Sequence, residues 1–434
     1  MTVRRFATVT STPGGGTRVR RVIPGAEYLR VFAVAEFSGL WAGLLLSKAG
    51  DQLARVALAV MAYDRTGSAA LTAVVYGLTL VPALLGGPLL GWLADRYPRR
   101  ELIVSCDVGR TVLVALMAVP GMPLPLIGGL VFASHLLDAP TRAARIALTP
   151  DVLPAAIYPT GVAINGFTSQ LMTLVGFAAG GVVVALAGPS PALAIDAATF
   201  AAAALITTLT VRRRPAAGGD GPARSWWSST NAGLRLIAGT PSLRNLLSLA
   251  LLAGFHVIPE AIAVPYAHSL GLGDTEAGIM MAAMPAGTLI GVFVLTTFVP
   301  ARSRLLLMAP MAVLASAPLV VALLQPGFVM VLVLWGLAGV CTAYQVSANA
   351  EFVRIVPNEQ RGQAVGLASS ALMAVQGLGV MLGGVLVDWA GPERGLAIAG
   401  LAGLAVSVPP LIGWFRVLAR QMGPGRVLTG ARPD

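Results

Sequence analysis

Four polar side chains recur at helical spacing inside the first long apolar run of the sequence. Lys48, Asp51, Gln52 and Arg55 follow an i, i+3, i+4, i+7 pattern, so on a helix they share one face. The opposite face is built from Leu, Ala and Val. A single charge can extend out of an apolar environment, but four polar groups on one face predict a wet cavity or a complementary polar face on a neighbouring helix. Asp51 is the member best suited to carry a proton.

A second polar stripe lies in the fourth apolar run. His135, Asp138 and Arg142 are spaced i, i+3, i+7, and Arg145 continues the same face. Histidine titrates near neutral pH, which suits a role in proton coupling. Arg145 can instead mark the end of the run. For the first stripe the structural alternative is a self-neutralised network, with Asp51 held between Lys48 and Arg55.

Other polar groups stand inside later apolar runs. His256 and Glu260 are spaced i, i+4, and Pro259 and Pro265 are expected to break the helix nearby. Glu260 is the only carboxylate inside the seventh apolar run. Asp196 lies nearer a helix end and is interpreted as structural. Uncharged candidates for the same pathway, each of which could equally make an interhelical hydrogen bond, are Asn165, Ser169, Gln345, Asn349 and Gln376.

The elements that must position these groups are membrane-spanning helices. The chain has 434 residues, of which 56% are hydrophobic and 11% charged, with a mean hydropathy of +0.79. Soluble chains carry roughly 25% charged residues, so this composition predicts an all-α membrane protein. Twelve runs reach the roughly 20 residues that a spanning helix needs. They cover 31–63, 71–94, a third ending at Pro120, 126–148, 159–187, 192–211, 246–270, 276–299, 305–324, 328–353, 363–389 and 395–418.

The chain divides into two six-helix halves. A basic tail of residues 1–30 precedes the N-terminal half, 31–211, and the C-terminal half covers 246–418 before a tail of 419–434. The polar segment 212–245 holds three consecutive arginines and a Gly/Pro/Asp stretch, and is interpreted as the linker. Short matches recur between the halves at an offset of about 201 to 203 residues, such as Ala187-Gly188-Pro189 and Ala390-Gly391-Pro392. Two parallel copies of one six-helix unit are an arrangement known among transporters.

Arginine decides the orientation. Every second connection carries it, including the N-terminal tail, the linker and the C-terminal tail, whereas the alternate connections hold only Arg65 and Arg394. The positive-inside rule therefore predicts a multi-pass protein of a bacterial inner or plasma membrane with both termini in the cytoplasm. The formal net charge of +11 is attributed to these loops facing anionic lipid, and binding of nucleic acid is not expected.

The turn after the second run carries a specific charged motif. It reads Gly91-Trp92-Leu93-Ala94-Asp95-Arg96-Tyr97-Pro98-Arg99-Arg100 and resembles the signature loop of the major facilitator superfamily, which reads G-x-L-A-D-R-x-x-R-R. The resemblance implies a fold of twelve transmembrane helices and a conformational latch that stabilises the outward-facing state. We expect the latch to comprise Gly91, Asp95, Arg96, Arg99, Arg100, Asp107 and Arg110; the alternative is that these arginines only set topology. The matching turn of the second half, 299–304, lacks an aspartate.

Further segments are similar to the drug:proton antiporter branch that includes macrolide-efflux and siderophore-export proteins. They include Pro140-Thr141-Arg142-Ala143-Ala144-Arg145 and Ile195-Asp196-Ala197-Ala198-Thr199-Phe200. The resemblance implies proton-coupled efflux of small amphipathic compounds, powered by the proton gradient without a cofactor, by a protein that is usually a monomer. Two alternatives stay open: a proton-coupled nutrient importer of the same fold, and a non-transporting membrane sensor or scaffold.

The sequence offers nothing that indicates an enzyme. It has no Walker-type phosphate loop, and its three histidines form no site that can be read from their spacing. Cys106 and Cys341 both fall inside apolar runs without paired spacing, so neither a disulfide nor a metal site is expected.

Overall fold

The computed structural model describes residues 26–90, 93–216, 226–357 and 360–421, and every regular element in these ranges is helical. The first half contains α1 (Ala26–Phe32), α2 (Ala35–Thr66), α3 (Ala69–Gly77), α4 (Pro82–Leu90), α5 (Leu93–Arg96), α6 (Arg99–Met117), α7 (Leu124–Val152), α8 (Tyr158–Ala187) and α9 (Pro189–Thr210). The second half contains α10 (Trp226–Gly239), α11 (Pro241–Leu251), α12 (Ala253–His256), α13 (Ile258–Ser269), α14 (Asp274–Phe298), α15 (Ala301–Leu314), α16 (Ala317–Val320), η1 (Val321–Leu324), α17 (Phe328–Thr342), α18 (Tyr344–Ile355), α19 (Arg361–Ala390) and α20 (Pro392–Gln421).

Ten helical segments of the described chain are long and apolar enough to cross a membrane. The other two long helices, α2 with 32 residues and α6 with 19, carry the charged groups that lower their average hydropathy. Both pack inside the bundle, because α2 contacts α8 and α9, and α6 contacts α7 and α9. The arrangement is consistent with the twelve predicted spans and makes this an all-α membrane protein.

Several predicted helices are interrupted near the middle of the bundle. The predicted second span breaks between α3 and α4, because Pro82 has no N–H to continue the helix. The seventh breaks at Leu252 and Val257, just before Pro259, and the tenth breaks at Ala343. The apolar runs 71–94 and 328–353 predict continuous helices, and the structure corrects both. Residues beside each of these breaks line the cavity between the halves that is described below.

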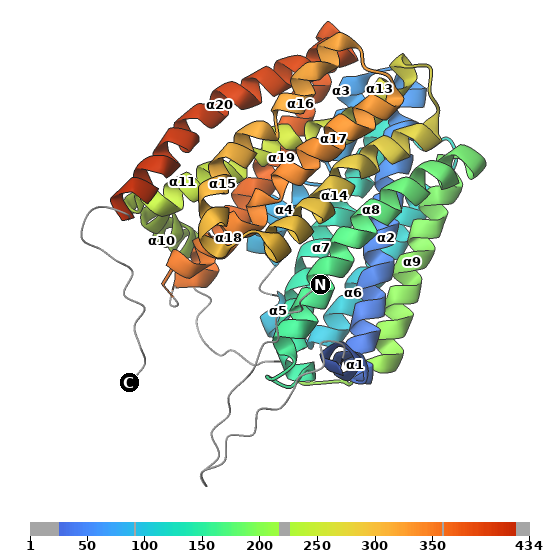
Figure 1. Cartoon of the computed structure of the whole chain (residues 1–434). Helices are drawn as coiled ribbons and strands as arrows, with labels where there is room; N and C mark the ends of the chain where they lie inside the picture. The colour runs from blue at the N-terminus through green and yellow to red at the C-terminus, as the bar shows by residue number, and fades with distance from the viewer. Residues whose placement is uncertain (1–25, 91–92, 217–225, 358–359, 422–434) are drawn as a thin grey trace.

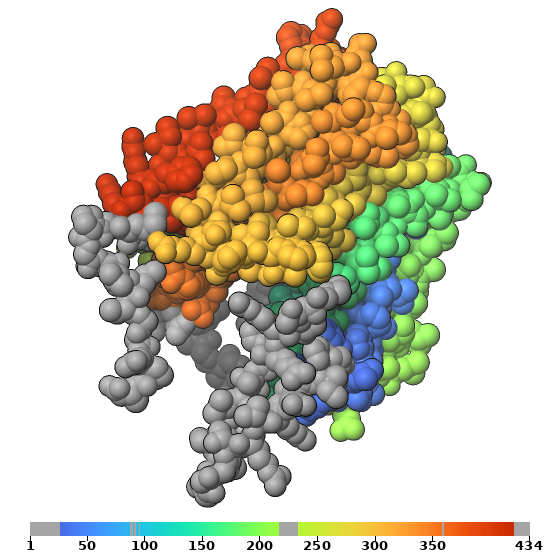
Figure 2. Space-filling view, in the orientation of Figure 1, coloured from blue at the N-terminus to red at the C-terminus, as the bar shows by residue number. Residues whose placement is uncertain are grey.

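The two halves meet at one end of the bundle. The main contacts between them join α3 to α19 and α8 to α14, and α13 packs on α2 and α3. We call this the far end; the other, which carries Arg99, Arg212 and Arg304, is the arginine-rich end. In Figure 1 the halves meet around α3 and α13 and diverge toward α5 and α10. Figures 1 and 2 show α14 lying along α8.

The connections at the far end are very short. Each of the six holds one residue with positive φ, namely Gly67, Gly121, Gly188, Gly271, Gln325 and Gly391. Gly188 alone separates α8 from α9, and Gly391 alone separates α19 from α20, with φ of 84° and 85°. Both α8 and α19 are 30 residues long. The repeat that the sequence predicts therefore has the same backbone geometry in both halves.

Large apolar side chains cover the outer surface of the helices. Among the most exposed are Leu186, Leu209, Val329 and Trp389, each more than two-thirds exposed. Exposed apolar side chains of this size, spread around a helical bundle, fit contact with lipid rather than with water.

Candidate functional site

The polar stripe of α2 has a buried partner on α6. Arg110 donates from Nη2 to Oδ1 of Asp51 at 2.6 Å, and only 1% of Arg110 and 6% of Asp51 is exposed. The guanidinium of Arg110 also lies over the ring of Phe200 from α9, 3.9 Å from its centroid. A buried cation that is paired and stacked in this way holds α2, α6 and α9 in one arrangement.

A second carboxylate shares the same cations. Asp138 of α7 lies 3.5 Å from Arg110 Nη1 and 3.8 Å from Lys48 Nζ, and Lys48 also lies 3.5 Å from Asp51 Oδ2. The predicted stripes of the first and fourth spans therefore meet at these four residues, which we call the charged cluster. Two carboxylates and two cations balance within it. Loss of Arg110 would leave Asp51, which is buried, without its closest cation.

The acidic residue one turn before Arg110 pairs elsewhere. Asp107 is fully buried and accepts from Nη2 of Arg145 at 3.2 Å. The structure thus places Asp107 and Arg110, which the sequence assigned to the latch, inside the bundle with the charges of α2 and α7. Asp196 is buried against Gly50, and its Oδ1 accepts from Thr199 at 3.3 Å. The interpretation of Asp196 as structural stays a prediction.

The charged cluster borders a cavity of about 320 Å³ within the first half. Lys48, Arg110 and Asp138 form part of its wall, together with Arg142, an exposed residue of α7. Asn165 and Ser169 of α8 lie on the facing wall. Six residues that the sequence selected as candidates therefore share one cavity, which we call the first-half cavity.

The last member of the α2 stripe faces a different space. Arg55 donates to Gln52 Oε1 at 3.2 Å, and its guanidinium lies 5.6 Å from the centroid of the Tyr76 ring. Gln52 is buried against Gly176 of α8. Asp51 is consequently held between Lys48 and Arg110, and Arg55 is not its partner.

Arg55 belongs to a cavity of about 450 Å³ between the two halves, which we call the central cavity. Its lining combines apolar, amide, hydroxyl and charged groups, namely Arg55, Tyr76, Leu80, Gln170, Thr173, Ala253, His256, Val257, Glu260, Met284, Pro285, Thr288, Thr342, Gln345, Val346, Met373 and Gln376. Both halves contribute, so the cavity changes shape when the halves move. Its volume falls in the range of about 300–1,000 Å³ that is typical of small-molecule sites.

One hydrogen bond crosses the central cavity from half to half. Tyr76 of α3 donates from its hydroxyl to Oε2 of Glu260 on α13 at 3.0 Å. Glu260 is the carboxylate among the residues that line the central cavity, and the guanidinium of Arg55 lies over the tyrosine ring. The arrangement offers a ligand an anionic, a cationic and an aromatic group close together.

The two predicted histidines occupy different surroundings. His256 is buried, lines the central cavity and lies 3.2 Å from Ser316 Oγ through Nε2. His135 contacts the carbonyl of Val131 at 3.0 Å through Nδ1, one turn earlier on α7. Within the described ranges, no group of three or more His, Cys, Asp or Glu residues is arranged to hold a metal ion.

The remaining amide candidates lie in the second half. Asn349 lines a cavity of about 300 Å³ formed by α11, α18 and α19, and Gln345 borders both this cavity and the central one. Gln376 of α19 lines the central cavity.

The motif after the second span ties several helix ends together. Arg99 pairs with Asp151 at 2.5 Å and donates to the carbonyl of Ala147, both on α7. Arg100 donates to the carbonyl of Thr208 on α9 at 2.6 Å, and Arg96 ends α5. Gly91 and the side chain of Asp95 lie outside the described residues.

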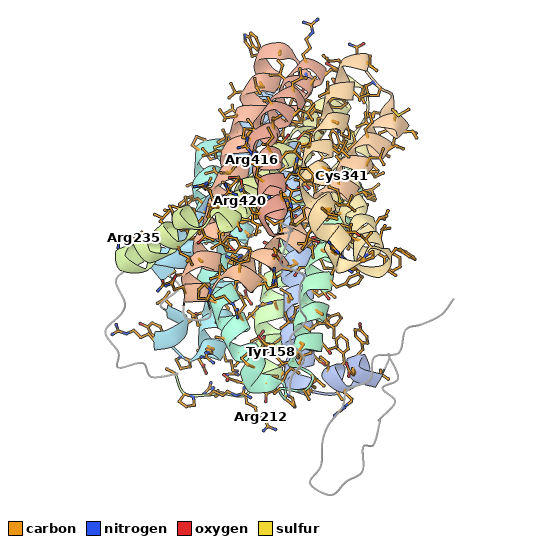
Figure 3. The ribbon with its side chains drawn as sticks, turned by 60° about the vertical axis from the view of Figure 1, so that its left-hand side comes forward. Tyr158, Arg212, Arg235, Cys341, Arg416 and Arg420 are labelled. Atoms are coloured by element: carbon orange, nitrogen blue, oxygen red, sulfur yellow. The ribbon has the colours of Figure 1, made fainter. Side chains whose placement is uncertain are left out.

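The start of the linker is fixed to the start of α2. Arg214 donates to Glu36 at 2.6 Å, and Arg212 lies 3.5 Å from the same carboxylate. In Figure 3, Arg212 lies at the end of the bundle where Tyr158 begins α8. This part of the linker therefore stays with the first half.

Sequence reasoning missed two polar residues that now stand out. Tyr76 is uncharged and belongs to neither polar stripe, so no sequence signal pointed to it, although it lines the central cavity. Asp388 accepts hydrogen bonds from the other half of the protein at the far end. A carboxylate in the last turn of a long helix was the available signal for Asp388, because that position is unfavourable without a partner.

Comparison with known proteins places this geometry in a family. The family model described as Major Facilitator Superfamily matches residues 40–325 and 261–427. The multidrug efflux pump Tap of Mycolicibacterium fortuitum is 26% identical over 395 residues, covering 87% of this chain and 92% of that protein. Macrolide efflux protein A of Streptococcus pyogenes is 21% identical over 395 residues, covering 88% of this chain and 97% of that protein.

Solved structures show the same fold. A bacterial homolog of the human lysosomal transporter Spinster, in an inward-facing and occupied conformation, has a TM-score of 0.67 at 17% identity and covers 93% of this chain and 98% of its own. The nucleoside transporter NupG has a TM-score of 0.64 at 15% identity and covers 87% of this chain and 99% of its own.

Proposed function

Because the chain belongs to the Major Facilitator Superfamily and is therefore a membrane transporter rather than an enzyme, we propose that it exports small amphipathic compounds in exchange for protons. The observation that carries the proposal is the central cavity, built by both halves from apolar, amide and charged groups. The efflux pumps that this chain is similar to support the direction. The proton gradient of a bacterial plasma membrane supplies the energy without a resident cofactor, and both termini face the cytoplasm.

The charged cluster is the proposed coupling element. Protonation of Asp51 neutralises one partner of Arg110, which then pairs with Asp138 alone. Asp51 and Arg110 belong to α2 and α6, so this change alters how the two helices are held. A proton shifts the balance between inward- and outward-facing states by its difference in affinity for them. Substrate binding in the central cavity shifts the same balance, and the two are thereby linked.

An efflux assay tests the coupling. In inverted membrane vesicles with an imposed pH gradient, uptake of a fluorescent amphipathic dye such as ethidium measures export. We expect Asp51→Asn to reduce gradient-driven uptake at least about tenfold, because the variant cannot exchange a proton at this position. The matched control is Asp64→Asn, an exposed carboxylate near the end of the same helix. Undiminished gradient-driven uptake in Asp51→Asn excludes Asp51 as the coupling site, and dye movement in the opposite direction indicates an importer.

Glu260 is expected to select the charge of the substrate. The change Glu260→Gln keeps the size of the side chain and removes its negative charge, so binding of a cationic dye should weaken about tenfold, whereas a neutral dye of similar size should be affected much less. Titration of dye fluorescence with purified protein measures both affinities. Tyr76→Phe is the control for the hydrogen bond, because it removes the donor and keeps the carboxylate. Equal losses for the cationic and neutral dyes would show that Glu260 acts only through structure.

A further inference from the structure

Asp388 occupies a place on α19 that its own helix disfavours. It lies in the last turn, three residues before Gly391, where the negative end of the helix dipole repels a carboxylate. Among the described residues, Asp388 takes part in no ion pair. Its stabilisation comes from a different helix.

That helix is α3, which belongs to the other half of the protein. Asp388 Oδ1 accepts from the backbone N–H of Ala69 at 2.6 Å, and Oδ2 accepts from Oγ of Ser68 at 2.6 Å. Ser68 is the N-cap of α3, and its Oγ also accepts from the N–H of Leu71. The N-terminus of α3 is thus capped jointly by its own serine and by a carboxylate from across the interface. The positive end of one helix dipole compensates the negative end of the other.

These hydrogen bonds exist only while the far end is closed. Beside them, Gly384 packs against Ala69 and Ala73, so the two helices approach with only the methyl group of Ala73 between their backbones. Separation of α3 from α19 by a few ångströms breaks both bonds and exposes uncapped amides of α3. The contact therefore favours the closed far end over the open one.

Among the described residues, the second interface between the halves shows no such contact. There α8 meets α14 through Gly181 and Gly278. The N-terminus of α14 is capped within its own half, because Gly273 N–H donates to Glu276 at 3.1 Å. Ala185, three residues before Gly188, occupies in α8 the place that Asp388 has in α19. The carboxylate is thus a feature of one interface of the two.

We infer that Asp388 forms a far-end latch, separate from the latch expected at residues 91–110. It stabilises the state closed at the far end by capping α3, and its hydrogen bonds break each time this end opens. It acts as a positioning residue and contacts no substrate in the central cavity. The inference requires only that the two halves alternate, and it holds for either direction of transport.

Distances between spin labels test this latch in the full-length protein. One label pair at Leu186 and Leu324 spans the halves at the far end, and a second pair at Leu209 and Phe298 spans them at the arginine-rich end. All four positions are well exposed, and Cys106 and Cys341 are first replaced by alanine. We expect Asp388→Ala to lower the ratio of far-end-closed to far-end-open molecules about fivefold, which corresponds to ~1 kcal/mol. The far-end distances lengthen while those at the opposite end shorten.

The matched control is Glu393→Ala. Glu393 is another carboxylate at the far end, but its hydrogen bond to Ser269, at 3.4 Å, lies within the second half. Glu393→Ala should leave both distance distributions unchanged, and Asp388→Asn, which keeps an acceptor for one of the two donors, should give an intermediate shift. A wild-type distribution in Asp388→Ala, or an equal shift in Glu393→Ala, overturns the latch. Because the readout is a distance, these outcomes are independent of whether dye export is found.

Discussion

Arg110→Met is expected to destabilise the protein more than any other single change in the charged cluster. The arginine is 1% exposed, and its loss leaves Asp51 without its closest cation and Asp138 with Lys48 alone. Removal of one partner of a buried ion pair typically costs about 3–5 kcal/mol. The stacking on Phe200 is lost as well. We expect the melting temperature in detergent to fall by about 5 °C or more, and gradient-driven dye uptake to disappear.

Three further variants separate stability from transport. Arg142→Met changes an exposed arginine beside the same cavity and should lower the melting temperature by less than about 2 °C. Arg110→Lys keeps the charge but loses the planar guanidinium that reaches both carboxylates. Its melting temperature should therefore lie between those of wild type and Arg110→Met. The double change Asp51→Asn with Arg110→Met removes both charges of the pair and should recover stability while transport stays absent. A wild-type melting temperature in Arg110→Met contradicts the role given to this residue.

The second large effect is expected from Gly278→Val, at the crossing of α8 and α14. A methyl group on Gly278 would lie 2.7 Å from the amide nitrogen of Gly181 and 2.8 Å from the carbonyl oxygen of Phe177. Both neighbours are backbone atoms, which cannot rotate away, so the two helices must separate. Forced separation of this kind typically costs about 1–3 kcal/mol. Since these helices belong to different halves, we expect the far end to stay open and dye transport to fall about tenfold or more.

Gly129→Val provides the control for this change. Gly129 lies on α7, and a side-chain carbon placed there would meet no atom within 4 Å. Transport by Gly129→Val should stay within about twofold of wild type. Labels at Leu186 and Leu324 should report a longer far-end distance in Gly278→Val alone. If Gly278→Val transports normally, the two helices need not approach as closely as the structure places them.

The helices were predictable because lipid imposes a simple rule on the sequence. A run of roughly 20 apolar residues must be helical to satisfy its backbone in the membrane. The breaks were harder to predict. Pro82 interrupts the second span, whereas Pro265 lies inside α13 without ending it, so proline alone does not decide where a helix stops.

The side-chain stripes predicted neighbours on one helix but not partners on others. Lys48 and Asp51 face α6 and α7, whereas Gln52 and Arg55 face α8 and the central cavity. Side chains three or four positions apart point in directions that differ by tens of degrees around the helix axis. A stripe of four residues can therefore border two cavities. The pairing of Asp51 with Arg110 depends on how α2 packs against α6. That packing is set by long-range contacts, which local spacing does not encode.

The one-residue turns at Gly188 and Gly391 have a mechanical consequence. Because a single residue joins α8 to α9 and α2 packs against both, we expect these two helices to move together. Through α8 this pair contacts α14 in the other half, and through α9 it contacts α2 and α6. Separation of the halves at Gly278 should therefore also displace α2 and α6, the helices that carry Asp51 and Arg110. If the proposed coupling holds, the proton and the substrate need not bind at the same place, because α8, with 30 residues, is about as long as the membrane is thick and can connect the two sites.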